Sequence, residues 1–136
     1  MLQQASNLYL SEYAWRTRIA DGALLLPLVS GTVAFSAPRL RAERARAKLR
    51  SAGVMAPALV LPGPSDVVVF LADANEFIID RGSLPAGVRF HGLAAEVPLP
   101  PTRMRFGSVR WLTRPDPVKR WLPSAAAIHA VLSVAD

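Results

Sequence analysis

The sequence predicts an α+β domain, with a mixed or antiparallel sheet of about five to seven short strands, helices at both termini and one basic helix after the second strand. Three observations predict this class. Short apolar runs of strand length recur between turns rich in glycine and proline. Few stretches repeat apolar residues at the 3.6-residue spacing of a helix. A length of 136 residues is typical of one domain, which we place over residues 1–136.

The N-terminal stretch, residues 2–20, is expected to form a helix. Leu8, Trp15 and Ile19 fall on one face at helical spacing, and Gly22 is suited to the left-handed position that ends a helix. Aromatic residues at this spacing usually face a core. We therefore interpret Trp15 as a packing group rather than a surface on which nucleic-acid bases stack.

Two strands, residues 23–28 and 32–36, are expected to follow this helix. Pro27 lacks an N–H donor, which places the first of them at a sheet edge. Pro38 then stands where a helix begins, because a missing N–H costs nothing at that position.

Residues 39–52 form the clearest helix of the sequence. Ala42, Ala45, Leu49 and Ala52 make a narrow stripe of small residues that would allow close approach to a sheet. Basic side chains flank this stripe on both sides. They are Arg39, Arg46 and Arg50 on one side, and Arg41, Arg44 and Lys48 on the other.

The second half of the chain is expected to hold most of the sheet and the last helix. Residues 67–71 are a continuous apolar run and are predicted to form its centre. For residues 76–80 the pattern fits a strand or one helical turn equally well. The other predicted elements are strands over 58–61, 88–90, 94–99 and 108–112, and a helix that starts at Ser124 and buries Ala125, Ile128, Val131, Leu132 and Ala135.

Charge is distributed unevenly along the chain, whose net charge is +6. Residues 39–50 hold six basic residues and one acid, and residues 103–120 hold the same numbers, so each block balances to +5. Between them, residues 51–102 balance to −3. Basic blocks of this kind suit an anionic partner such as nucleic acid, but they are equally typical of a solvated arginine-rich surface.

Composition excludes several function classes. The chain has no cysteine, so disulfides, thiol catalysis and cysteine-ligated metals are excluded. Its apolar runs fall far short of the roughly 20 residues that span a bilayer, so no membrane partner is expected. The first residues have neither the basic nor the apolar region of a signal peptide. The expected location is therefore cytoplasmic.

Three motifs in the stretch 85–112 carry a resemblance to a known family. They are Val-Arg-Phe-His-Gly at 88–92, Val-Pro-Leu-Pro-Pro-Thr at 97–102 and Gly-Ser-Val-Arg-Trp at 107–111. This pattern resembles the closing segment of the primase-polymerase domain of bifunctional DNA primase/polymerase proteins, in the form common in actinobacteria. The resemblance extends over residues 8–136 and implies that the family's N-terminal portion is missing.

The resemblance also implies where catalytic acids would stand. In the family, paired carboxylates that hold divalent cations lie on the strand before the basic helix, but residues 32–38 here contain none. The following hairpin has Asp66 but not the family's histidine, and Arg89 aligns with a third acid. We therefore expect a catalytically degenerate relative that is not an enzyme and needs no cofactor or metal.

Other residues with catalytic potential are interpreted as structural. His91 is expected to be a turn histidine bonded to the backbone, and Ser36 has no recognisable nucleophile motif around it. Asp73, Glu76 and Asp80 are expected to form a solvated acidic surface rather than a metal site.

The leading functional hypothesis is weak, sequence-nonspecific binding of nucleic acid through an arginine-rich surface. The alternative is a protein–protein interaction module or a homodimer, with an interface from residues 2–20, residues 67–71, Trp111 and Trp121. The predicted nucleic-acid-binding residues are Arg39, Arg41, Arg44, Arg46, Lys48 and Arg50, with Arg103, Arg105 and Arg110 as a second group.

Overall fold

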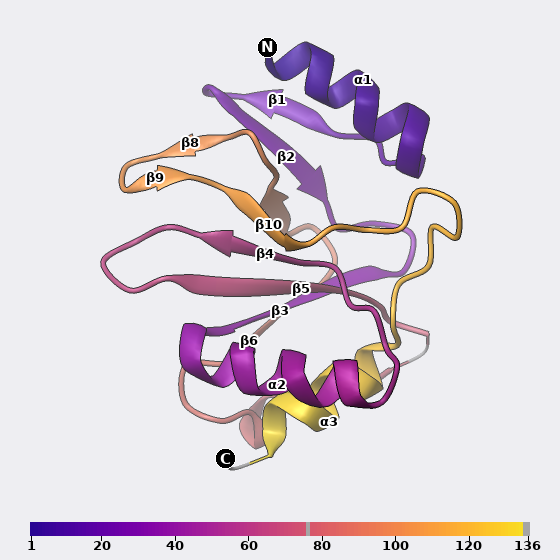
Figure 1. Cartoon of the computed structure of the whole chain (residues 1–136), viewed down its shortest axis with the longest axis vertical. Coiled ribbons are helices and arrows are strands. Elements are labelled where there is room, and N and C mark those ends of the chain that lie inside the picture. The colour runs from indigo at the N-terminus through magenta and orange to yellow at the C-terminus, as the bar shows by residue number, and fades with distance from the viewer. Residues whose placement is uncertain (76, 135–136) are drawn as a thin grey trace.

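The structure is a computed structural model that describes residues 1–75 and 77–134, and of Arg81 the backbone alone. Three helices and ten short strands occupy the described residues (Figure 1). The helices are α1 (Leu2–Tyr13), α2 (Arg39–Ser51) and α3 (Ala125–Ser133), and Arg81–Ser83 form a short 3₁₀ turn. The strands are β1 (Arg18–Ala20), β2 (Ala23–Pro27), β3 (Thr32–Pro38), β4 (Ala58–Leu61), β5 (Val67–Asp73), β6 (Arg89–His91), β7 (Glu96–Pro98), β8 (Arg103–Met104), β9 (Gly107–Ser108) and β10 (Arg110–Thr113).

The strands form a five-stranded antiparallel sheet, ordered β10-β4-β5-β3-β6, and two smaller sheets, β1-β2-β7 and β8-β9. The predicted α+β class, with helices at both ends, is confirmed. The basic helix follows the third strand rather than the second, because β1 lies within the stretch expected to be helical. Strand β5 lies at the centre of the main sheet, as its apolar run predicts.

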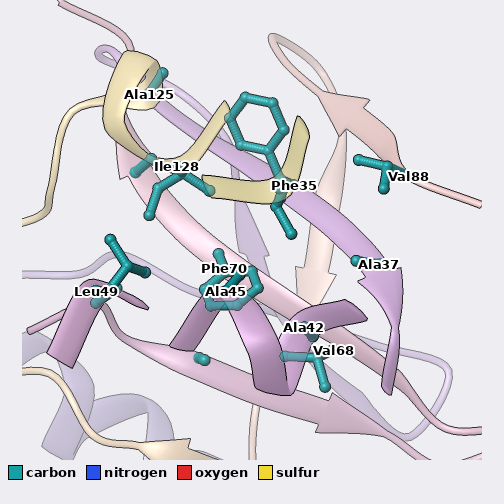
Figure 2. Packing of buried hydrophobic residues seen from close by; sticks show 14 of the residues in the cluster. Phe35, Ala37, Ala42, Ala45, Leu49, Val68, Phe70, Val88, Ala125 and Ile128 are labelled. Carbon is teal, nitrogen blue, oxygen red and sulfur yellow. The ribbon is translucent and has the colours of Figure 1, made fainter. Parts of the chain in front are cut away.

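Helices α2 and α3 cover one face of the main sheet. Alternate residues of the central strands, including Phe35 and Phe70, point toward these helices and are fully buried (Figure 2). The small residues Ala42 and Ala45 on α2 are also buried, so the helix approaches the sheet closely. Ala52 was expected to extend this stripe, but it lies beyond the helix and is exposed.

The other face of the main sheet packs against the β1-β2-β7 sheet and helix α1. Leu59, Val69 and Leu71 point to this side, where they meet buried Leu24 and Val97. The domain therefore has two apolar layers separated by the main sheet, one under α2 and α3 and one under α1 and the small sheet.

Four aromatic residues join α1 to the main sheet. The Tyr9 hydroxyl donates to the Pro100 carbonyl oxygen at 2.8 Å and accepts from Trp111 Nε1 at 3.2 Å. Trp15 stacks on Tyr9 with 6.0 Å between ring centroids, and it lies 6.2 Å from Trp111. Tyr13 lies beside Trp15 at 5.2 Å. The aromatic residues near the N-terminus are thus packing groups, as predicted.

The first helix is shorter than the sequence predicts. It ends at Tyr13, because Ala14 adopts a left-handed conformation with φ 59° and its N–H bonds the Leu10 carbonyl. The chain then reverses direction, and Ile19 pairs with Leu24 across a hairpin whose turn contains Gly22. The expected apolar face was also wrong, since Leu8 and Ile19 are exposed.

Two further expectations about strands were wrong. Strand β2 is the middle strand of its sheet and not an edge, and Pro27 is tolerated because it stands at the strand end opposite Glu96. His91 belongs to strand β6, and the turn begins after it at Gly92. Residues 77–80 have no regular structure, and Glu76 lies outside the described residues.

The last helix begins as predicted. The Ser124 hydroxyl accepts a hydrogen bond from the Ala127 N–H at 3.2 Å, which caps α3. Ala125, Ile128 and Leu132 are buried, Val131 is half-buried, and Ala135 lies outside the described residues.

Candidate nucleic-acid interface

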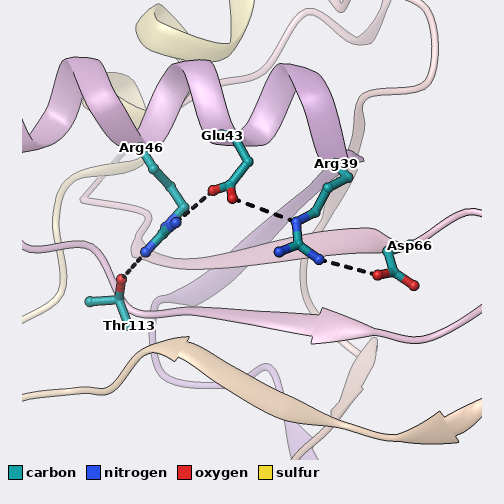
Figure 3. Close-up of polar contacts among 5 residues, drawn as sticks. All are labelled: Arg39, Glu43, Arg46, Asp66 and Thr113. Atoms are coloured by element: carbon teal, nitrogen blue, oxygen red, sulfur yellow. Dashed lines mark hydrogen bonds and ion pairs between the residues drawn. The ribbon is translucent and has the colours of Figure 1, made fainter.

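Two cations of α2 are held in a network with acidic side chains (Figure 3). Arg39 pairs with Asp66 at 3.1 Å and with Glu43 at 3.6 Å. Arg46 also pairs with Glu43 and donates to the Thr113 hydroxyl at 3.0 Å. The hydrogen bond from Arg46, together with the charges of both arginines, holds the pKa of Glu43 below its ordinary value. This network ties α2 to the β4–β5 turn and to β10.

A third cation of α2 caps another helix. Arg41 donates from Nη1 to the carbonyl oxygens of Leu132 and Val134, each at 3.0 Å, at the C-terminal end of α3. The last carbonyls of a helix lack partners within it and carry partial negative charge, so an arginine there is stabilising. Arg39, Arg41 and Arg46, all predicted to bind nucleic acid, therefore have structural partners inside the domain.

The remaining cations of α2 face solvent. Arg44, Lys48 and Arg50 are exposed, and within the part of the chain that the structure describes they form no ion pair or hydrogen bond. Arg44 and Lys48 line a shallow hollow on the outer side of the helix with Ala47 and Ser51. This side of α2 therefore presents positive charge that no acidic residue of the described chain neutralises.

The second predicted group lies on and beside the β8–β9 hairpin. Arg103 and Arg105 are exposed on the hairpin, and Arg110 is exposed on β10, the edge strand of the main sheet. The Arg105 guanidinium carbon lies 5.4 Å from the centroid of the Phe106 ring. In Figure 1 the hairpin lies on one side of strands β10, β4 and β5, and α2 lies on the other. The two groups therefore occupy separate elements of the fold.

An open pocket of about 390 Å³ lies between the main sheet and strand β7 of the β1-β2-β7 sheet. Its wall is mostly apolar, with Val67, Val69 and Val97 among its residues, and Ser36 and His91 supply polar atoms. Ser36 Oγ and His91 Nε2 are 2.9 Å apart. His91 thus contacts a serine side chain, a partner that the sequence did not suggest.

Sequence reasoning missed this Ser36–His91 pair. The two residues are brought together by the pairing of β3 with β6, in which Ala34 stands opposite His91 and Ser36 opposite Arg89. No local motif signals such a pairing, because 55 residues separate the two side chains. The available signal was the position of Ser36 between the apolar residues Phe35 and Ala37 of its strand.

Two further observations concern other classes of site. Among residues 1–75 and 77–134, no three side chains of His, Cys, Asp or Glu are grouped closely enough to hold a metal ion together. In the same part of the chain, no helix has the length and apolar character required to cross a membrane.

Comparisons of the chain with protein-family models, with curated proteins and with solved structures gave no match.

Proposed function

We propose that the protein is a non-catalytic, cytoplasmic nucleic-acid-binding module that contacts phosphates and reads no base sequence. One observation carries the proposal. Three of the nine predicted cations are engaged inside the domain, and the other six are exposed without an acidic partner in the described chain. These six are Arg44, Lys48, Arg50, Arg103, Arg105 and Arg110.

Arginine suits this task because its planar guanidinium offers several donors to phosphate oxygens. Cations that neutralise phosphates release condensed counterions, so affinity falls as salt rises. If all six cations contact duplex phosphates, affinity is expected to fall about 1,000-fold between 50 and 200 mM salt. The resemblance of residues 88–111 to the primase-polymerase domain, a family that acts on DNA, adds support.

The test is fluorescence polarisation with labelled DNA and RNA, single- and double-stranded, at several salt concentrations. Arg44→Glu with Lys48→Glu should weaken binding to every probe by at least tenfold. The matched control is Arg16→Glu with Arg89→Glu, which changes the net charge equally at two exposed positions outside both groups. Absence of binding to all four probes at low salt would end the proposal.

A protein–protein interaction module or homodimer remains the second candidate, and one observation favours it. Arg120 donates to the carbonyls of Ser11 and Glu12, which places Trp121 beside the C-terminal turn of α1. Trp121 is 54% exposed, and Leu8 on α1 is 53% exposed. Sedimentation showing only monomer at high concentration would count against a homodimer.

Other parts of that predicted interface are not accessible. Residues 68–71 are buried at the centre of the main sheet, and Trp111 is half-buried in the aromatic cluster. The second candidate therefore depends on α1 and Trp121 alone.

A further inference from the structure

The β8–β9 hairpin has a firmly held base. Arg103 pairs with Ser108 and Met104 with Gly107, so Arg105 and Phe106 form the tip. Just below, the Val109 N–H donates to the Thr102 carbonyl at 2.9 Å. The Thr102 hydroxyl in turn accepts from the Leu24 N–H at 2.9 Å, and Thr102 is 2% exposed. These contacts fix the direction in which the tip points.

Phe106 at this tip contributes little to the fold. Its side chain is 55% exposed, and it belongs to neither buried apolar cluster of the described residues. The turn itself favours small or polar residues at this position, before the glycine at position 107. The ring therefore stands outside both buried clusters, at a position where its contribution to folding is small.

The surroundings of the ring are cationic. Arg105 lies over the ring at 5.4 Å from its centroid, Arg103 is exposed on the same hairpin, and Arg110 is exposed on β10, the strand that directly follows the hairpin. Surfaces that bind single-stranded nucleic acid combine these two features, because arginines track the phosphates while an aromatic ring stacks on a base. A base in a duplex is already stacked and paired, so only an unpaired base can use the ring.

We propose that the hairpin gives the protein a preference for single-stranded nucleic acid. In this complex an unpaired base stacks on Phe106, and Arg103, Arg105 and Arg110 hold the phosphates next to that base. The inference rests on the proposed nucleic-acid binding and adds the preferred substrate class. One base–aromatic stack is expected to favour a single strand over a duplex by roughly tenfold.

A lipid surface is the other partner that cations beside an exposed ring could suit. Besides Phe106, the large apolar side chain exposed on the hairpin is Met104, at 38%. Stable binding to a membrane surface needs a larger apolar area in addition to cations. The balance of three arginines to one well-exposed ring favours the nucleic acid.

The experiment compares Phe106→Ala, Phe106→Trp and Phe106→Asn on a labelled oligothymidylate and on a duplex of equal length. Phe106→Ala and Phe106→Asn should lose roughly tenfold in affinity for the single strand and less than about twofold for the duplex, whereas Phe106→Trp should retain the preference. The slope of log affinity against log salt should stay unchanged in Phe106→Ala and fall in Arg105→Ala. Leu93→Ala, at a turn residue that is 84% exposed, is the matched control and should behave as wild type.

The outcomes separate this inference from the function on which it rests. If the wild type binds neither probe, both fail. If it binds both equally and Phe106→Ala changes nothing, the single-strand preference fails while phosphate binding stands. If Phe106→Ala instead abolishes sedimentation with vesicles of phosphatidylglycerol and phosphatidylcholine and leaves oligonucleotide binding intact, the ring serves a lipid surface and the inference is overturned.

Discussion

Helix α2 lies in one of the two +5 blocks of the sequence and the β8–β9 hairpin lies in the other, but the cations of these two elements have different roles in the fold. On α2, Arg39, Arg41 and Arg46 bond to groups of other elements, so half of the cations of that block stabilise the domain. On the β8–β9 hairpin, Arg103 and Arg105 are exposed and form no ion pair in the described residues. The flanks of a packed helix lie beside acceptors, whereas a projecting hairpin tip has few within reach.

This difference shows that the residues of one basic run can have different roles in the folded protein. What decides the role of each cation is the presence of a carboxylate or a helix C-terminal carbonyl within its reach. Arg120 makes the same point inside the second block, since it binds the last carbonyls of α1. The predictions that follow test whether α2 is a structural element that also carries charge, while the hairpin tip is dispensable for folding.

The largest effect is expected from Ala45→Leu. Ala45 is 1% exposed between α2 and the main sheet, and extra methyl groups there would push the helix away from the sheet. The free energy of unfolding should fall by about 2–3 kcal/mol, measured by urea denaturation. Ala47→Leu, on the exposed side of the same helix, should change it by less than about 0.5 kcal/mol. Equal losses in the two variants would contradict the packing described for α2.

Arg46→Ala should have the next largest effect. The side chain is 17% exposed, and its removal leaves Glu43 and Thr113 without a shared donor. The expected loss is about 1–2 kcal/mol in the free energy of unfolding. Arg44→Ala is the matched control on the same helix and should stay within about 0.5 kcal/mol of wild type. A larger loss of stability in Arg44→Ala than in Arg46→Ala would contradict the assignment of Arg46 as a structural cation and of Arg44 as an exposed surface cation.

Low pH should destabilise the ion-pair network around Glu43, with a smaller effect on stability than Arg46→Ala. The pKa of Glu43 is lowered in the folded state, chiefly by the hydrogen bond from Arg46, so this carboxylate contributes stability that is fully present above the ordinary pKa that it has in the unfolded chain. That stability is lost as pH falls through the lower folded value. Urea midpoints measured between about pH 6 and pH 3 should therefore fall less steeply in Glu43→Gln than in wild type. Identical pH profiles would show that Glu43 is not coupled to its arginines.

The smallest effect is expected at the hairpin tip. Phe106→Asn and Arg105→Ala should each change the free energy of unfolding by less than about 0.5 kcal/mol, because both side chains are exposed and outside the buried clusters. Thermal or urea denaturation measures this directly. A loss above 1 kcal/mol would give the tip a folding role and remove the contrast with α2.

Local patterns in the sequence were enough to predict some elements. The stripe of Ala42, Ala45 and Leu49 identifies α2, and the continuous apolar run after Asp66 identifies the central strand β5. Both depend on residues close together in the chain. The end of α1 was not predictable in this way, because it depends on the pairing of Ile19 with Leu24 in a hairpin whose first strand shows no apolar alternation.

The candidate site was less predictable than the fold. The sequence is enough to locate the two basic blocks that contain the nine cations. Which of these cations form hydrogen bonds or ion pairs inside the domain depends on partners that are distant in the sequence. Arg39 finds Asp66 at a separation of 27 residues, Arg46 finds Thr113 at 67, and Arg41 finds Leu132 at 91. The exposure of Phe106 was not predictable either, because the sequence does not indicate whether an aromatic residue in a basic segment is buried.

The aromatic cluster that joins α1 to the main sheet has a practical consequence. Trp15 and Trp111 lie close enough for their electronic transitions to couple, and Trp111 also donates to the Tyr9 hydroxyl. Near-ultraviolet circular dichroism is sensitive to fixed aromatic packing of this kind. The chain thus contains an intrinsic optical probe of whether α1 is docked, and release of that helix should be visible as a change in the near-ultraviolet spectrum.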